Sequence, residues 1–231
     1  MKLTGIQEIR GTITLKSGLH IGSGETEMRI GGTDNPVVKH PHTQEPYIPG
    51  SSLKGKIRSL LELRSGLMVD SKGAPLSLKH LKDLEGQKRV VCENILKLFG
   101  SSGADTDEEV ALGPSRVSFA DCPLHQAWKA RALEEHWPLT EVKSENSINR
   151  ISGTAQNPRF TERVPAGAEF SFSICLKSLD AEENLLEFLL QGIKLLQLDA
   201  LGGNGSRGYG QVAFSFDDAE IQKTFEAVNP F

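Results

Sequence analysis

The chain has 231 residues, 38% of them hydrophobic and 24% charged, and its formal net charge at pH 7 is −4. These values exclude a disordered chain, and the length is enough to bury a sizeable core, so we expect one elaborated domain over residues 1–231. No apolar run reaches membrane-spanning length and the start lacks the apolar core of a signal peptide, so we expect a cytoplasmic protein without a membrane partner. Three widely spaced cysteines argue against a disulfide framework.

Six segments carry the periodicity of regular secondary structure. Alternating apolar residues predict four strands, marked in chain order by Ile13 and Leu15, by Val117 and Phe119, by residues 170–176 and by residues 212–216. Helical spacing predicts two helices, one over residues 52–64 with Leu53, Ile57, Leu60 and Leu61, and one with Leu185, Leu189, Ile193 and Leu196.

The order of these elements is βαββαβ, the ferredoxin-like motif of an antiparallel sheet backed by two helices, which RNA-recognition folds share. We therefore predict an α+β fold with a ferredoxin-like (RRM-like) core and large insertions. The core segments are residues 6–16, 51–65, 115–121 and 168–217, and the insertions are residues 17–50, 66–114 and 122–167. Such a fold does not by itself indicate a function.

The net negative charge counts against nucleic-acid binding, but the charge is unevenly distributed. Residues 1–66 carry nine Lys/Arg and six Asp/Glu, a local charge of +3, whereas residues 180–231 carry three and nine, a local charge of −6. Nucleic-acid binding confined to one face of the protein is therefore compatible with the composition.

The segment before the first predicted helix holds an isolated aspartate, Asp34. An aspartate before Asn-Pro is ordinarily a turn residue whose carboxylate bonds nearby backbone N–H groups, and the residues alone favour that role. Ser51 or Ser52 can cap the helix, and Lys54 and Arg58 lie one turn apart on one of its faces. A phosphate would fit near this helix N-terminus, whose N–H groups favour anions.

The segment LGGNGSRGYG at residues 201–210 contains five glycines and formally matches a dinucleotide-binding pattern. A dinucleotide site needs a strand before the glycines and a helix after them, whereas here a helix precedes and a strand follows. A helix C-cap explains one or two glycines but not five. Gly203 and Gly205 suit close approach of the backbone to a nucleic-acid strand, with Arg207 and Tyr209 available for phosphate contact or stacking.

Histidines and cysteines do not form a recognisable metal cluster. His40-Pro41-His42 has no second pair of ligands, and Cys122 with His125 is a solitary pair, so a structural zinc site is disfavoured. A lone histidine such as His20, at a strand end before a flexible turn, is more often structural than functional. The sequence also lacks GxSxG and P-loop patterns.

Several segments share their order and spacing with a known family. They are GLHIGSGE at residues 18–25, GGTDNPVV at 31–38, PYIPGSSLKGKIRSLLE at 46–62, KLFG at 97–100, ENSINRISGTAQNPRFTERVPAG at 145–167 and LGGNGSRGYG at 201–210. In these segments the chain resembles the RAMP superfamily of RNA-binding proteins and, within it, the backbone subunit of type III-A CRISPR (Csm) effector complexes.

The resemblance implies a subunit that binds CRISPR guide RNA and complementary target RNA, and that assembles with further copies of itself in a helical filament and with other Csm subunits. It also implies that Asp34 serves metal-dependent endonuclease cleavage of target RNA, with Mg²⁺ or another divalent cation held by the carboxylate, RNA phosphate oxygens and water. Whether Asp34 ligates the metal or orients the 2′-hydroxyl stays open.

Further RNA contacts follow from the same resemblance. Residues 145–167, which composition alone leaves as a surface hairpin with or without a function, then form a thumb-like hairpin that interrupts the guide–target duplex. Arg150 and Arg159 on it, and His20 in the GLHIGSGE segment, then contact RNA.

Two alternative functions remain. A guide-processing RAMP endoribonuclease would act without metal, with His20 rather than Asp34 as general acid or base. A purely structural filament subunit would bind RNA in the same way without cleaving it.

Overall fold

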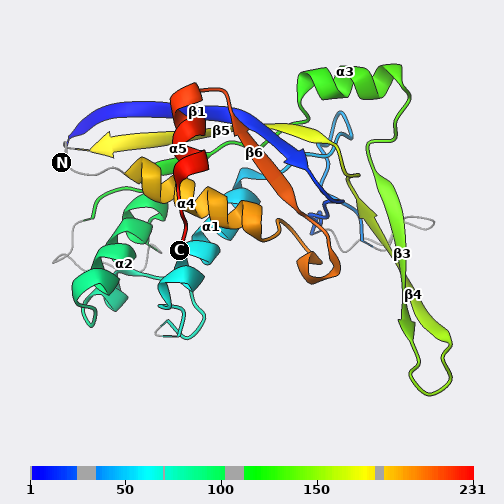
Figure 1. The fold of residues 1–231 in the computed structure, drawn as a ribbon, viewed down its shortest axis with the longest axis horizontal. Helices are drawn as coiled ribbons and strands as arrows, with labels where there is room; N and C mark the ends of the chain where they lie inside the picture. The colour runs from blue at the N-terminus through cyan, green and yellow to red at the C-terminus, as the bar shows by residue number, and fades with distance from the viewer. Residues whose placement is uncertain (1, 25–34, 70, 102–111, 180–184) are drawn as a thin grey trace.

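The structure is a computed structural model, and it describes residues 2–24, 35–69, 71–101, 112–179 and 185–231. The protein is a mixed α+β fold with two antiparallel sheets (Figure 1). The larger sheet has the order β2-β5-β1-β6, with β1 at Leu3–Leu15, β2 at Val117–Phe119, β5 at Glu169–Leu179 and β6 at Val212–Phe216. The smaller sheet is a hairpin of β3 (Glu141–Ile148) and β4 (Ala155–Arg163) that projects from the body.

The helices pack on one face of the larger sheet or in the insertions between its strands. They are α1 (Gly50–Ser65), α2 (Gly86–Phe99), α3 (Gln126–Glu134), α4 (Leu185–Leu198) and α5 (Ala219–Ala227), with short 3-10 turns at Leu78–Leu81 and Gly205–Arg207. In Figure 1, α1 and α4 lie beneath the sheet, and α3 lies above the base of the hairpin, at the end opposite its turn. In the described ranges, no helix is long and apolar enough to cross a membrane.

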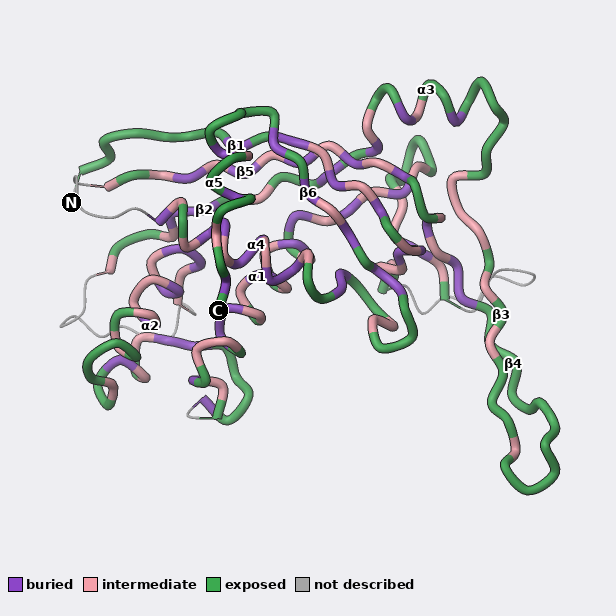
Figure 2. The backbone as a smooth tube through the Cα atoms, in the orientation of Figure 1, coloured by how far each residue is buried: buried purple, intermediate pink, exposed green. Residues whose placement is uncertain are grey.

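Alternation along the strands separates a buried face of the sheet from a polar one. On β1, Ile9 and Ile13 are fully buried, whereas Glu8 and Arg10 are exposed. The pairing places Ile9 opposite Ile174 of β5, so the apolar side chains of both strands point to the side that α1 and α4 cover. Figure 2 shows the resulting core between sheet and helices.

An aromatic cluster at the β1–β5–β6 junction depends on a glycine. The ring of Phe172 meets Phe214 and Phe216 edge-on, with centroids 5.7 and 5.5 Å apart. Gly11 on β1 lies opposite Phe172, and a Cβ on Gly11 would stand 2.8 Å from that ring and overlap the carbonyl oxygen of Ser215. A side chain at this position would therefore displace the ring from the core.

The six elements expected from periodicity are confirmed, and one expected detail is wrong. The strands and helices follow in the order β1, α1, β2, β5, α4, β6, with β3–β4, α2, α3 and α5 added. The N-cap of α1 is Pro49, which makes no side-chain cap bond, so Ser51 and Ser52 lie inside the helix and do not cap it. The extended Tyr47-Ile48-Pro49 segment leads directly into α1, so the helix begins two or three residues earlier than the serines suggested.

The three cysteines are free thiols. Cys92 and Cys122 are buried and Cys175 is half-buried. Burial is the main reason that the pKa of Cys92 rises to about 11 and that of Cys122 to about 12. Both thiols therefore stay protonated and unreactive at neutral pH.

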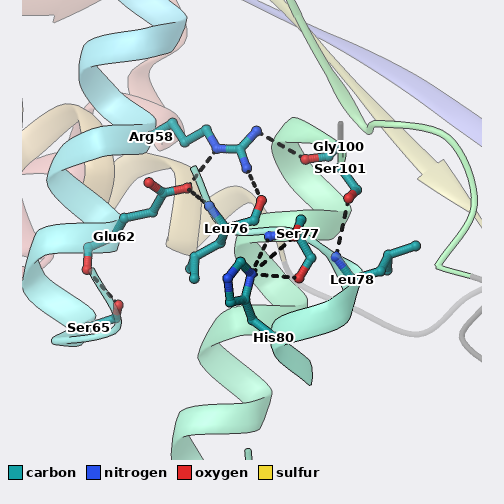
Figure 3. A network of polar contacts seen from close by, with 9 residues as sticks. All are labelled: Arg58, Glu62, Ser65, Leu76, Ser77, Leu78, His80, Gly100 and Ser101. Carbon is teal, nitrogen blue, oxygen red and sulfur yellow. Dashed lines mark hydrogen bonds and ion pairs between the residues drawn. The ribbon is translucent and has the colours of Figure 1, made fainter. Parts of the chain in front are cut away.

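Arg58 ties α1 to the segments before and after α2 (Figure 3). Its Nε atom donates to Glu62 Oε1 at 2.8 Å, Nη1 donates to the carbonyl of Gly100 at 3.0 Å and Nη2 donates to that of Leu76 at 2.6 Å. The backbone N–H of Leu76 returns a 3.1 Å bond to the Glu62 carboxylate, which is almost fully buried. The guanidinium therefore closes a network inside the protein.

We expect Arg58→Met to lower the free energy of unfolding by about 3 kcal/mol, because it leaves the buried Glu62 carboxylate without its cation. Urea denaturation measures the change. The matched control is Arg89→Met, which removes the same kind of i,i+4 pair from a side chain that is 40% exposed, and which we expect to cost less than about 1 kcal/mol. Equal effects of the two substitutions would contradict the structural role of Arg58.

Candidate nucleic-acid interface

Three segments that are distant in sequence meet beside the root of the β3–β4 hairpin. The segment after β1 pairs with the end of the hairpin through reciprocal bonds between Leu19 and Val164, at 2.9 and 2.8 Å. The same segment accepts bonds from the glycine-rich loop, from Gly203 N–H to the His20 carbonyl at 2.8 Å and from Gly210 N–H to that of Gly18 at 2.9 Å. The sequence motifs at residues 18–24, 145–167 and 201–210 thus meet beside the hairpin root.

Two glycines allow the glycine-rich loop to lie this close. Gly202 and Gly210 have φ of 74° and 71°, a left-handed region that residues with a Cβ rarely adopt. A Cβ on Gly202 would overlap the carbonyl oxygen of His20, and one on Gly210 would overlap that of Leu201. The loop follows α4 and precedes β6, which confirms that its context differs from a dinucleotide site.

His20 is held by the hairpin as well as by the glycine-rich loop. Its Nδ1 atom lies 2.7 Å from the carbonyl oxygen of Glu162. Because a carbonyl oxygen only accepts, Nδ1 carries the proton in this bond, and Nε2 of the neutral ring is left as an acceptor. The half-buried ring also lies close to Gly203. A Cβ added to Gly203 would stand 3.5 Å from Cδ2 of His20.

Glu145 on β3 joins the hairpin to the glycine-rich loop. Its carboxylate accepts a bond from Arg207 Nη1 at 2.5 Å and one from the hydroxyl of Tyr209 at 3.0 Å, and it lies 3.3 Å from Lys143 Nζ. Burial raises the pKa of Glu145, but the bonds from Tyr209 and Lys143 and the charge of Arg207 outweigh it, so the pKa is below its ordinary value. Arg207 also donates to Asn204 in its own loop.

Tyr209 is less accessible than its sequence context indicated. Its side chain is fully buried, and the cationic groups of Lys143 and Arg163 lie 4.6 and 5.0 Å from the ring centroid. The expectation that this ring is available for base stacking is therefore not met in this structure. Desolvation and the bond to Glu145 raise the pKa of the Tyr209 hydroxyl.

Glu162 on β4 is a buried carboxylate that fixes the chain downstream of Asp34. It accepts bonds from Lys39 Nζ at 2.5 Å, from the N–H of Val37 at 2.9 Å and from the hydroxyl of Thr140 at 2.8 Å. Its own N–H donates to the carbonyl of Asn35, the residue that follows Asp34. Asp34 itself lies outside the described residues.

The α1 residues predicted to bind RNA differ in their exposure and in the partners that they already have within the protein. Ser51 is exposed and Ser52 and Lys54 are half-buried, and Lys54 makes no ion pair with any described residue. The first N–H of the helix, that of Gly50, already donates to the carboxylate of Asp121 at 2.8 Å. The donors of Arg58 are directed into the protein (Figure 3), so its expected phosphate contact would need this network to open.

Arg150 lies at the turn of the hairpin, away from the other predicted residues, whereas Arg159 lies on β4 opposite Glu145, which bonds Arg207. Both arginines are exposed. The turn is shaped by Asn149, whose side-chain oxygen accepts bonds from the N–H groups of Ile151 and Ser152. The structure therefore separates the predicted site into a hairpin turn, a hairpin root with the glycine-rich loop, and α1.

The residues that organise the hairpin root were not predicted from the sequence. They are Lys39, Lys143, Glu145 and Glu162. Charged residues alternate along β3 at Glu141, Lys143 and Glu145, which is a signal for a strand, but this pattern does not show which charges meet the glycine-rich loop. No group of three or more His, Cys, Asp or Glu within the described ranges could hold a metal ion.

Known proteins resemble this chain over most of its length. A family model described as the RAMP superfamily matches residues 12–213. The "CRISPR system Cms endoribonuclease Csm3" of Methanothermobacter thermautotrophicus is 38% identical over 219 residues, which cover 89% of this chain and 82% of that protein. The Streptococcus thermophilus protein of the same name is 40% identical over 206 residues, covering 87% and 84%.

Solved structures give the same result. A chain of the Csm3-Csm4 subcomplex of the type III-A CRISPR-Cas interference complex superposes with a TM-score of 0.55 at 25% identity, covering 99% of both chains. The Methanopyrus kandleri Csm3 crystal structure superposes with a TM-score of 0.59 at 26% identity, covering 93% of this chain and 76% of that one. The chain therefore belongs to the RAMP superfamily and, within it, to the Csm3 family of type III-A CRISPR backbone subunits.

We expect Glu162→Gln to destabilise the protein by about 2 kcal/mol at neutral pH, because it removes charged hydrogen bonds that join β4 to the chain after Asp34. Burial raises the pKa of Glu162, but the bonds from Lys39, Val37 and Thr140 outweigh it, so its folded pKa is depressed. The carboxylate thus stabilises the fold above the unfolded pKa, and this contribution is lost as the pH falls through the folded pKa.

Urea denaturation of both proteins between neutral pH and about pH 3 tests this prediction. The difference between wild type and variant should be largest at neutral pH and shrink on acidification. Glu141→Gln, which removes a more exposed carboxylate from the same hairpin root, is the control and should show a smaller difference. A Glu162→Gln difference that grows in acid would contradict the assignment.

Proposed function

We propose that the protein is a repeating guide-RNA-binding subunit of a type III-A CRISPR interference complex and that it cleaves guide-bound target RNA in a metal-dependent manner. The observation that carries this proposal is that three of the segments shared with the family meet at the hairpin root. Relatives at 37–40% identity are named endoribonucleases, which supports the nuclease activity.

The architecture supports a ferredoxin-like core. The sheet order β2-β5-β1-β6, with α1 between β1 and β2 and α4 between β5 and β6, is the arrangement expected of a βαββαβ motif. The β3–β4 hairpin is the element we assign as thumb-like, because it projects from this core and its outer residues are exposed (Figures 1 and 2).

The RNA path we propose runs past α1 and the glycine-rich loop toward the hairpin. Lys54 offers a cation that makes no ion pair with any residue that the structure describes, Ser51 and Ser52 offer hydroxyls, and Gly203 and Gly205 allow an RNA backbone to approach the loop. Arg207 is 47% exposed despite its bond to Glu145, so a phosphate can reach it. Such contacts to the RNA backbone are independent of sequence, as a guide-binding subunit requires.

For cleavage, we assign the catalytic role to Asp34. In the reaction we propose, the 2′-oxygen of a displaced target nucleotide attacks the adjacent phosphorus, the bond from phosphorus to the 5′-oxygen breaks, and the products are a 2′,3′-cyclic phosphate and a 5′-hydroxyl. A bound divalent ion would neutralise the charge that develops on this phosphate. The described residues do not form a complete metal site, and the Glu162 carboxylate is already occupied by Lys39, Val37 and Thr140.

We expect Asp34→Ala to lower target cleavage by about 100-fold or more while guide and target affinities stay nearly unchanged, because one carboxylate contributes little to binding a polyanion. The assay is cleavage of labelled complementary RNA by the assembled complex in Mg²⁺, together with filter binding. Asp83→Ala, which removes an exposed aspartate between the 3-10 turn and α2, is the matched control.

The outcomes separate the alternatives. Unchanged cleavage by Asp34→Ala would refute the catalytic assignment. Cleavage that persists under chelation and is lost in His20→Ala would favour a guide-processing enzyme, since Nε2 of His20 is placed as an acceptor. Binding without any cleavage by the wild-type complex would favour a structural filament subunit.

We also expect the number of subunits per RNA to increase with guide length. Head-to-tail contacts between identical subunits are heterologous and do not need to close, so they extend along the RNA as an open helical filament. Analytical ultracentrifugation with guide RNAs of increasing length measures the stoichiometry. A fixed ratio of one protein per RNA at every length would contradict the filament.

A further inference from the structure

The β3–β4 hairpin is divided into two parts by an irregularity in its pairing. Residues 141–145 pair with residues 159–163, and the register shifts between Glu145 and Ser147. Such a bulge bends the strands and redirects side chains near it. Beyond the shift, residues 146–158, which we call the distal arm, are exposed except for the half-buried Asn149 (Figure 2).

Glu145 is the outermost hairpin residue with a contact to the body among the described residues. Its carboxylate receives Arg207 and Tyr209 from the glycine-rich loop, at 2.5 and 3.0 Å, and its side chain is only 18% exposed. A further ion pair of the hairpin root, Arg163 with Glu141 at 2.8 Å, joins β4 to β3 and does not leave the hairpin. The contacts of Glu162 and Val164 lie closer to the base.

The donors around Glu145 have few ways to relax if the carboxylate is neutralised. A glutamine amide keeps one acceptor oxygen but turns an NH2 group toward the two donors, so the buried Tyr209 hydroxyl and Arg207 would have to share that oxygen in a site with little access to water. Arg207 would keep its bond to Asn204 in the same loop, but its link to the hairpin would weaken. The link between loop and arm therefore depends on the charge of a single side chain.

We infer that Glu145 is a positioning residue, which fixes the direction in which the distal arm leaves the body by binding Arg207 and Tyr209. A phosphate that binds Arg207 competes with the Glu145 carboxylate for the same guanidinium. Occupation of the glycine-rich loop by an RNA backbone and the position of the arm are therefore coupled. This consequence for RNA rests on the proposed function, whereas the link itself is a property of the free protein.

Spin-label distance measurements on the free protein test the link. One label is placed at the turn through Ser152→Cys and one on α5 through Lys223→Cys, in a background with Cys175→Ser, because the thiols of Cys92 and Cys122 are buried. With Glu145 and Arg207 unchanged, the distances between the two labels should form one narrow distribution. Glu145→Gln should broaden it, whereas Glu141→Gln, the matched substitution on the same strand and within the hairpin, should leave it narrow.

Further variants change Arg207, the partner of Glu145 in the glycine-rich loop. Arg207→Gln should broaden the distribution as Glu145→Gln does, Arg207→Lys should partly restore it, and the double variant with both glutamines should be no broader than either single one. Additive broadening, or a narrow distribution in both single variants, would overturn the inference. Thermal unfolding of each variant separates a loose arm from a loss of the fold.

The effect on cleavage is measured separately. In assembled complexes, Glu145→Gln should blur the regular spacing of the products while Glu141→Gln leaves it sharp. If wild-type complexes do not cleave, the proposed function fails and the spin-label result still decides the inference. If cleavage is regular in Glu145→Gln although its distance distribution is broad, the positioning role in the reaction is overturned.

Discussion

The buried carboxylate of Glu162 joins the hairpin root to the chain after Asp34 and to the segment that leads into β3. Its side chain accepts bonds from Lys39, Val37 and Thr140, while its backbone bonds Asn35 and His20. A buried carboxylate is costly unless its acceptor positions are filled, so this arrangement exists only when all the segments are in place. The contacts of Glu162 therefore fix three parts of the protein at once: His20, the chain after residue 34 and the hairpin root.

The cations of the interface are mostly neutralised inside the protein before RNA arrives. Arg207 and Lys143 face Glu145, and Arg163 faces Glu141. This pairing explains how a chain with a net charge of −4 can present an RNA-binding surface without a basic patch that attracts any polyanion. In the proposed RNA path, a phosphate at Arg207 would exchange one anionic partner for another, so its net binding free energy would be smaller than that of a phosphate contact to a free cation.

The sequence predicts the strands and helices that bury one face, because such an element has periodic apolar residues. It does not predict the role of a side chain whose contacts come from residues distant in the chain. Alternation along β5 and helical spacing in α4 identified both elements, because the sheet and helices bury one side only. Lys54 and Arg58 look equivalent in sequence, one turn apart, yet only Arg58 meets carbonyls from beyond α1. Tyr209 looked accessible between glycines, but it is buried by hairpin cations that lie more than forty residues earlier in the chain.

The root and the distal arm of the hairpin are held in different ways, and Glu145 lies at the boundary between them. The root is fixed by buried and charged contacts, so its position relative to the glycine-rich loop is well defined. Among the described residues, no side-chain hydrogen bond joins the distal arm to the body, so the exposed faces of the arm are available for contacts that the isolated chain does not make. Because Arg207 and Tyr209 meet the hairpin beside the register shift, the inferred positioning role of Glu145 implies that a change at this one link alters the direction of the whole distal arm.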